Sequence, residues 1–280
     1  MTQRCIVFDG LAVITGGQVT RATAFLRRVR SYDGLSRLVV LRSQGNWIPD
    51  GERLNFDVID VALPGGKCRA AGRMLWQNLR LPGLLKQFKA DVYLSFSHYL
   101  PMTLPSGLMT IMGVTNFAPF SDLAMQAEVT AQGKLRLAML KRTILSSATR
   151  AHRVVALSEA LRRDLVRFGV DGKKIIVIPN GVDVSSDPGW DTERKSESDR
   201  CGVNGKFLLY VSHFYRYKNF ERLIRAYAGL SLELRGQFSL VLIGEPRDAE
   251  YYREINALIE ALGMNRRVVV IPGLPSADQI

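Results

Sequence analysis

The chain has 280 residues, of which 47% are hydrophobic and 23% are charged, and its formal net charge is +12. This composition excludes a disordered protein, because it supplies enough apolar side chains for one large domain or two of ordinary size. The surplus of positive charge favours anionic partners: nucleic acid, phosphorylated metabolites or an acidic membrane surface.

The sequence contains no pattern that is typical of secretion or membrane insertion. The first residues, MTQRCIVFDG, lack the apolar core of a signal peptide, and no run of 18 apolar residues occurs. The three cysteines fit no zinc or haem spacing, and their small odd number suits a reducing cytosol. We therefore expect a cytoplasmic protein. Among the anionic partners, we do not expect nucleic acid. Its scattered arginines fit a solvated surface or a peripheral contact with the inner, anionic face of a membrane.

Short apolar strands alternate with helical patterns over the first 184 residues. We predict strands at 5–8, 38–41, 56–61, 92–96, 108–114, 153–157 and 175–178, and helices at 20–30, 68–88 (broken near Pro82 and Gly83), 132–147 and 159–168. This alternation predicts an α/β fold with a parallel, doubly wound sheet. Ligands of such sheets bind beyond the carboxyl ends of the strands.

Several residues that follow these strands should share that edge of the sheet, and we place them near an acceptor or a phosphate: Gly16, Gly17, His98, Thr115 and Ser158. The glycine pair either lets the backbone approach a ligand or only forms a tight turn. His98 fits a substrate contact or a hydrogen-bonded structural role, and Ser158 is also predicted to cap a helix. The separated histidines argue against a metal site, so we expect neither a metal nor another cofactor.

A polar stretch at 185–205 is predicted to link an N-terminal domain, 1–184, to a C-terminal region, 206–280. The αβ pattern resumes there with strands at 207–211, 239–243 and 268–271, and helices at 220–230 and 249–262. We predict that the first of these strands is buried. Three strands make an incomplete second Rossmann-like domain.

The loop at 212–218 carries most of the predicted chemistry. It leads to a helix opened by Asn219, and the free N–H groups of a helix N-terminus favour an anion. Lys218 and Arg216 add positive charge, which suits a diphosphate leaving group stabilised without a metal. The alternative is that Lys218 and Asn219 only begin the helix.

Together these pieces resemble the family-4 retaining glycosyltransferases, which have the GT-B fold of two facing Rossmann-like domains. After the glycine pair at 16–17, the resemblance rests on RVVALSEALRRDLVRFGV (153–170), KKIIVIPNGVD (173–183), LLYVSHFYRYKNFERLIRAY (208–227) and LVLIGEPRDAEYYREINALIEALGMNRRVVVIPGL (240–274). It implies transfer of a sugar from a nucleotide-diphosphate sugar to a glycan or lipid-linked acceptor, in polysaccharide or lipopolysaccharide assembly.

The resemblance also implies roles for individual residues. Lys218 matches the lysine that contacts the donor diphosphate, while His213 stands where the family usually has an arginine, so Arg216 is the possible substitute. Thr115 and Asn116 stand where the family often has a histidine, and we assign Asn116 a catalytic contact. Further donor contacts are implied at Ser212, His213, Gly244 and Leu274.

The pair of glutamates that contacts the donor sugar and ribose in the family has no counterpart in this sequence. We therefore expect weak or no activity of these 280 residues alone. A truncated, non-catalytic remnant or an acceptor-binding subunit without a complete donor site is the alternative. A dehydrogenase would need a three-glycine fingerprint, which neither half contains.

Overall fold

The computed structural model describes residues 4–14, 17–30, 37–43, 48, 56–181 and 205–273. It divides into two compact units: unit 1 comprises Met1–Ser121 and Lys134–Val182, and unit 2 comprises Asp122–Gly133 and Asp183–Ile280. The predicted linker, apart from its last residue, and the predicted site residues Gly16 and Leu274 lie outside the described residues.

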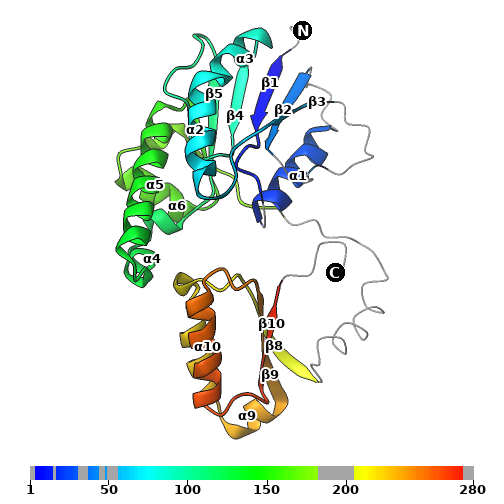
Figure 1. Cartoon of the computed structure of the whole chain (residues 1–280), viewed down its shortest axis with the longest axis vertical. Coiled ribbons are helices and arrows are strands. Elements are labelled where there is room, and N and C mark those ends of the chain that lie inside the picture. Colours follow the sequence, from blue (N-terminus) through cyan, green and yellow to red (C-terminus); the bar gives the residue numbers. More distant parts are fainter. Residues whose placement is uncertain are drawn as a thin grey trace. The chain divides into compact units, whose positions relative to one another are not determined.

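Seven parallel strands form the sheet of unit 1, in the order β3-β2-β1-β4-β5-β6-β7 (Figure 1). They are β1 (Cys5–Asp9), β2 (Arg37–Ser43), β3 (Asp57–Val61), β4 (Val92–Ser95), β5 (Met109–Val114), β6 (Arg153–Ala156) and β7 (Ile175–Val177). The strand order changes direction between β1 and β4, where Val7 lies beside Tyr93. Open α/β sheets bind their ligands at such a switch point. The predicted doubly wound sheet is confirmed.

Helices cover both faces of this sheet because successive side chains of a strand point to opposite faces. The helices of this part of the chain are α1 (Gly17–Arg30), α2 (Arg69–Leu79), α3 (Leu81–Gln87), α5 (Ala131–Arg150) and α6 (Glu159–Arg167), with 3₁₀ turns η1 (Gly66–Cys68), η2 (Ala118–Phe120) and η3 (Gly172–Lys174). On one face Phe8 belongs to a buried cluster with Leu26 of α1. On the other, Val7 belongs to a cluster with Leu85 of α3 and Ile144 of α5.

Unit 2 contains three parallel strands in the order β10-β9-β8 within the described residues. Its elements are α4 (Asp122–Ala127), β8 (Lys206–Val211), the 3₁₀ turn η5 (Arg216–Lys218), α8 (Phe220–Ala228), α9 (Leu232–Gln237), β9 (Phe238–Gly244), α10 (Ala249–Ala261) and β10 (Val268–Pro272). Figure 1 shows α10 lying along the sheet. The core combines Phe220 and Ile224 of α8, Tyr251 of α10, and Leu240 and Leu242 of β9.

The predicted burial of the strand at 207–211 is wrong. β8 lies at an edge of the described sheet and pairs only with β9 there. Its apolar side chains are therefore between 42% and 53% exposed at Phe207, Leu208, Leu209 and Val211. Apolar content predicts a strand at this place, but it does not say how many neighbours the strand has.

Two helix boundaries differ from the prediction for local reasons. The break in the predicted helix at 68–88 falls at Arg80, and Pro82 lies in the first turn of α3, where its missing N–H group has no helical partner to lose. The sequence pattern also does not predict α4 and α9, because each has six residues and so less than two turns of periodic signal.

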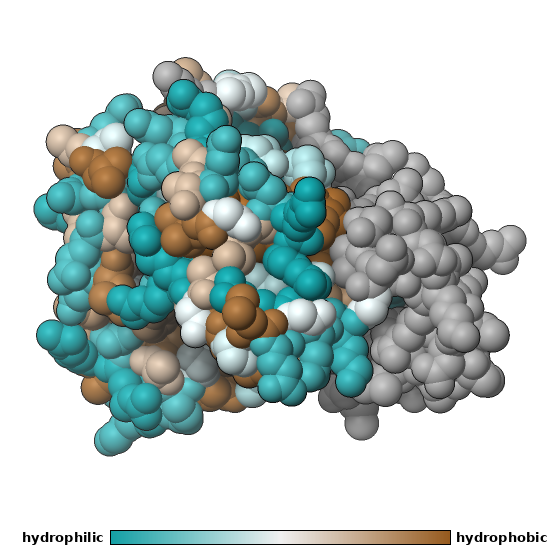
Figure 2. Space-filling model, turned by 90° about the horizontal axis from the view of Figure 1, so that it is seen from below, coloured by the Kyte–Doolittle hydropathy of each residue, from teal (hydrophilic) through white to brown (hydrophobic). Residues whose placement is uncertain are grey.

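The surface of the described part combines polar and apolar side chains. On the face drawn in Figure 2, hydrophobic residues gather in small patches that hydrophilic ones separate. Among the described residues, none of the helices combines the length and the apolar character needed to span a bilayer.

Candidate functional site

The loop that follows β8 is fixed by the loop that follows β9. The Ser212 N–H donates to the Ile243 carbonyl at 2.8 Å, and the Phe214 N–H donates to the Glu245 carbonyl at 2.9 Å. Gly244 permits this approach, because a Cβ atom at that position would overlap the Ser212 carbonyl. The predicted residues Ser212 and Gly244 therefore lie together, and the Ser212 N–H is used within the protein. Their contacts with a nucleotide-sugar stay predictions.

Arg216 is held by carboxylates of the α10 segment. Its Nη1 and Nη2 each donate to Glu254 at 2.7 Å, and its Nε lies 3.6 Å from Asp248. The hydrogen bonds between them raise the pKa of Arg216 and lower the pKa of Glu254. Two carboxylates thus neutralise the guanidinium, which braces the loop against α10. The diphosphate contact of Arg216 stays a prediction.

Lys218 is the exposed cation at the end of the same loop. Its backbone is fixed, because its N–H donates to the Tyr215 carbonyl at 2.9 Å and its carbonyl accepts the Tyr210 hydroxyl at 3.1 Å. Its Nζ lies 5.4 Å from the ring centroid of Tyr217 and forms no ion pair with a carboxylate of the described residues. A positioned ammonium group with an uncompensated charge can stabilise an anion that comes close to it.

The N-terminus of α8 is less open to an anion than the sequence predicts. Asn219 has the left-handed backbone angles φ 57° and ψ 44°, and its side chain does not cap the helix. The Tyr251 hydroxyl instead accepts the Phe220 N–H at 3.1 Å and also faces the N–H of Glu221. Burial raises the pKa of Tyr251 to about 12, so the hydroxyl is neutral. The helix terminus therefore already has a protein acceptor.

His213 lies beside this loop with a quarter of its side chain exposed. Its Nδ1 atom is 3.9 Å from Glu245 Oε2 and is buried without a hydrogen-bond partner among the described residues. The ring meets Tyr215 edge-on at a centroid distance of 6.5 Å. The contact of His213 with the nucleotide-sugar donor stays a prediction.

In unit 1, His98 and Thr115 lie together at the ends of β4 and β5. The Thr115 N–H donates to His98 Nε2 at 3.1 Å, and Thr115 Oγ1 is 2.7 Å from the same nitrogen. Nε2 is therefore an acceptor, and the neutral ring carries its proton on Nδ1. Burial, followed by the charges of Arg73 and Arg21, lowers the pKa of His98 to about 4.

The neutral state of His98 makes stability depend on pH. In the unfolded chain the ring takes up a proton near its ordinary value of 6.5, whereas the folded protein resists protonation down to about pH 4. Because the unfolded state binds more protons in this window, acid destabilises the fold. We expect the wild type to lose about 2 kcal/mol more stability between pH 7 and pH 5 than His98→Asn, measured by urea unfolding. Asparagine tolerates the left-handed backbone at this position, where φ is 59°. Equal losses would contradict the buried neutral imidazole.

The remaining predicted residues of unit 1 make local contacts. Ser158 Oγ accepts the Leu161 N–H at 3.2 Å, which confirms the predicted helix cap. Asn116 Oδ1 accepts the Ala118 N–H at 3.0 Å in a side-chain turn. Gly17 begins α1 with open space where a Cβ atom would lie.

Sequence reasoning missed a buried polar cluster at the switch point between β1 and β4. Asp9 is fully buried and accepts hydrogen bonds from the Leu11 N–H at 2.9 Å, Gln77 Nε2 at 2.5 Å, the Tyr93 hydroxyl at 2.5 Å and Ser97 Oγ at 3.2 Å. A carboxylate at the end of the first apolar strand is the sequence signal that indicates this cluster.

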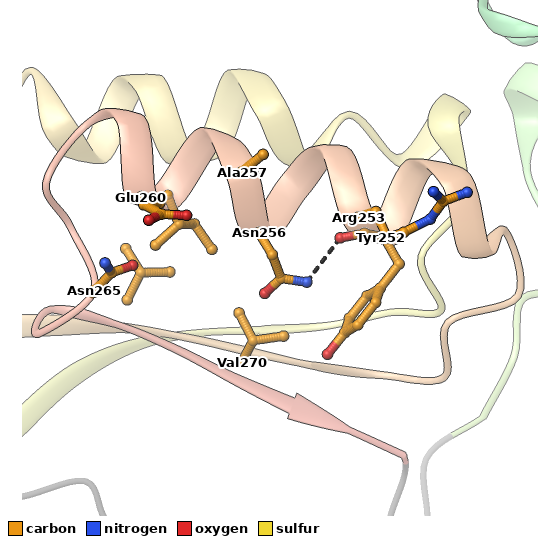
Figure 3. A pocket seen from close by; sticks show the side chains of 9 residues that line it. Tyr252, Arg253, Asn256, Ala257, Glu260, Asn265 and Val270 are labelled. Atoms are coloured by element: carbon orange, nitrogen blue, oxygen red, sulfur yellow. Dashed lines mark hydrogen bonds between the residues drawn. The ribbon is translucent and has the colours of Figure 1, made fainter.

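A hollow of about 630 Å³ lies elsewhere in unit 2, between α10 and β10 (Figure 3). There the Asn256 amide donates to the Tyr252 carbonyl at 2.8 Å. The hollow is lined by Tyr252, Arg253, Asn256, Ala257, Ile259, Glu260, Asn265, Val268 and Val270. None of these belongs to the predicted site.

Comparison with known sequences identifies two family matches. Residues 15–186 match Glycosyltransferase Family 4, and residues 191–280 match Glycosyl transferases group 1. The D-inositol 3-phosphate glycosyltransferase of Kineococcus radiotolerans is 34% identical over 105 residues, which cover 34% of this chain and 23% of that protein. An uncharacterized glycosyltransferase of Methanocaldococcus jannaschii is 25% identical over 111 residues, covering 38% and 26% respectively. The similarity thus spans about a quarter of each of these relatives.

Solved structures share the fold over nearly the whole chain. Anabaena Alr3699/HepE in complex with UDP and glucose has a TM-score of 0.65 and 18% identity, and the match covers 98% of this chain and 70% of that one. The sucrose-phosphate synthase of Thermosynechococcus elongatus has a TM-score of 0.62 and 14% identity, with coverage of 97% and 71%. These likenesses confirm the predicted GT-B fold. Because the first family match spans more than half of the chain, this protein belongs to Glycosyltransferase Family 4.

Proposed function

We propose that the chain forms part of a retaining glycosyltransferase that uses a nucleotide-diphosphate sugar as donor. The observation that carries this proposal is Lys218, an exposed and unpaired cation among the described residues, on a loop fixed at the carboxyl ends of two parallel strands. The complex of the structurally similar Anabaena protein with UDP and glucose supports a nucleotide-sugar donor.

In the proposed reaction the bond between the sugar and the diphosphate breaks, and negative charge develops on the leaving diphosphate. The Lys218 ammonium stabilises that charge without a metal ion. The braced Arg216 and the close approach at Gly244 act indirectly, because they hold the loop in place before the donor arrives. Because the loop is already in place, less free energy is needed to position Lys218 when the reaction occurs.

The proposed acceptor is a glycan or a lipid-linked acceptor that binds at the edge of unit 1, beside the buried His98 and its partner Thr115. Assembly of a polysaccharide or lipopolysaccharide at the cytoplasmic face of a membrane fits the net charge of +12, since basic surfaces are attracted to anionic lipids.

Replacing Lys218 with alanine is expected to weaken the binding of UDP-glucose about tenfold or more, because it removes a charged contact to the diphosphate. Isothermal titration calorimetry on the full chain measures this effect. Lys206→Ala is the matched control: Lys206 is also exposed, but it begins β8 at the end opposite the loop. The affinity of Lys206→Ala for UDP-glucose should equal that of the wild type.

Two results would contradict the proposal. One is an unchanged affinity of Lys218→Ala, and the other is a wild type that binds none of a panel of UDP-, GDP- and ADP-sugars. If transfer is observed, NMR of the product gives the anomeric configuration, and inversion would exclude the retaining mechanism.

A further inference from the structure

One face of α2 presents polar side chains to the carboxyl edge of the unit 1 sheet. Arg69, Arg73 and Gln77 are spaced four residues apart, so they lie in one row along the helix. At one end of the row, Arg69 Nη2 donates to Ser43 Oγ at the end of β2, at 2.8 Å. At the other end, Gln77 Nε2 donates to Asp9 at the end of β1. The row therefore runs along the edge where α/β sheets bind ligands.

Positive charge exceeds negative charge in this region. The charges of Arg73 and Arg21 both act on His98, and Arg73 also interacts with Asp9 and Arg69. Burial lowers the pKa of Arg73 and that of Arg21. Among the described residues that interact with Arg73, Asp9 is the one carboxylate.

Asp9 forms no hydrogen bond with Arg69 or Arg73. Its Oδ2 accepts from Gln77 Nε2, the Tyr93 hydroxyl and Ser97 Oγ, and its Oδ1 accepts from the Leu11 N–H. The carboxylate therefore contributes its charge to the cluster, while its hydrogen bonds go to other groups.

Three buried polar atoms in the row have no hydrogen-bond partner among the described residues: Arg69 Nε, Arg73 Nε and Gln77 Oε1. Unsatisfied buried groups are uncommon because each loses its hydration without compensation. The row thus offers two unmet donors on guanidinium groups and one unmet acceptor. These are complementary to an oxyanion with a hydroxyl group beside it.

We propose that Arg69 and Arg73 bind an oxyanion, a phosphate or a carboxylate, carried by the sugar acceptor. The assignment to the acceptor rests on the proposed function, whereas the oxyanion site rests on unit 1 alone. Guanidinium forks suit either anion, because both present paired oxygens at matching spacing. Gln77 Oε1 accepts a neighbouring sugar hydroxyl. A phosphorylated sugar and a sugar acid are the two sources of this chemistry.

The test measures binding of glucose 6-phosphate, glucuronate and uncharged glucose by calorimetry, using the full chain with Lys218→Ala so that the loop of unit 2 contributes no cation. We expect one of the two charged sugars to bind at least tenfold more tightly than glucose, and the stronger one identifies the anion. Adding Arg73→Gln should lower the affinity for the preferred charged sugar at least tenfold. Arg73→Lys should lower that affinity less. Arg80→Gln is the matched control, because Arg80 directly follows α2 and is exposed.

Equal binding of all three sugars would overturn the proposal, and so would an affinity that Arg73→Gln leaves unchanged. If Arg73→Gln fails to fold, Arg69→Gln and Arg73→Lys supply the same comparison. The result is independent of the donor proposal. A wild type that binds no nucleotide-sugar contradicts that proposal, whereas equal binding of charged and uncharged sugars contradicts this one.

Discussion

Replacing Asp9 with alanine is expected to destabilise unit 1 by about 4 kcal/mol. The substitution removes a fully buried carboxylate that accepts four hydrogen bonds, and it leaves Arg73 without its opposite charge. Gln77, the Tyr93 hydroxyl and Ser97 would then lose an acceptor in a site that water does not reach. Urea unfolding should show a lower midpoint with an unchanged slope.

Asp57→Ala is the control for this prediction. Asp57 also lies on a strand of unit 1 and pairs with Arg37, but both side chains are at least half exposed. Exposed ion pairs contribute less than about 1 kcal/mol, so this substitution should have little effect. If Asp9→Ala costs as little as Asp57→Ala, then Asp9 is not the acceptor that holds the buried cluster together.

Gly244→Ala should have the second-largest effect, a loss of about 3 kcal/mol in unit 2. The added methyl group would overlap the backbone of Ser212, and backbone atoms cannot move aside as a flexible side chain can. The loop at 212–218 must then separate from β9. Hydrogen exchange should detect faster exchange of the Ser212 and Phe214 amides, whose acceptors lie in the neighbouring loop.

Gly236→Ala separates this effect from a general consequence of replacing glycine. Gly236 lies in α9, and a Cβ atom there would contact nothing within 4 Å. Alanine favours helix over glycine, so this variant should gain about 0.5–1 kcal/mol. If both variants lose stability equally, the close approach at Gly244 is not the cause.

Much of the fold could be predicted from the sequence, because strands such as 38–41 and 153–157 are short apolar runs separated by helical patterns. The parallel sheet follows from that alternation, and with it the shared edge where His98 and Thr115 meet. The family match at 15–186 agrees with the resemblance drawn from short motifs.

Partners of single side chains could not be predicted, because they depend on contacts between distant segments. Arg216 and Glu254 are 38 residues apart, and no local pattern joins them. Its place in an apolar helical pattern indicates that Tyr251 is a core residue of α10. The pattern does not indicate that its hydroxyl accepts a hydrogen bond from the Phe220 N–H, the first of α8. From the sequence alone, Arg69 and Arg73 are expected to be solvated surface charges. In the structure α2 brings them to the edge of the sheet, where Arg69 binds Ser43 and Arg73 interacts with Asp9.

The exposed strand β8 affects how the protein behaves at high concentration. Within the described residues its second edge has no strand beside it, and its apolar side chains are half accessible. Such an edge can pair with the same edge of another molecule, and the side chains of both copies then shield each other from water. Self-association in storage should therefore begin at β8, while the seven-stranded sheet of unit 1 remains folded. Solubility and thermal stability are then governed by different parts of the chain.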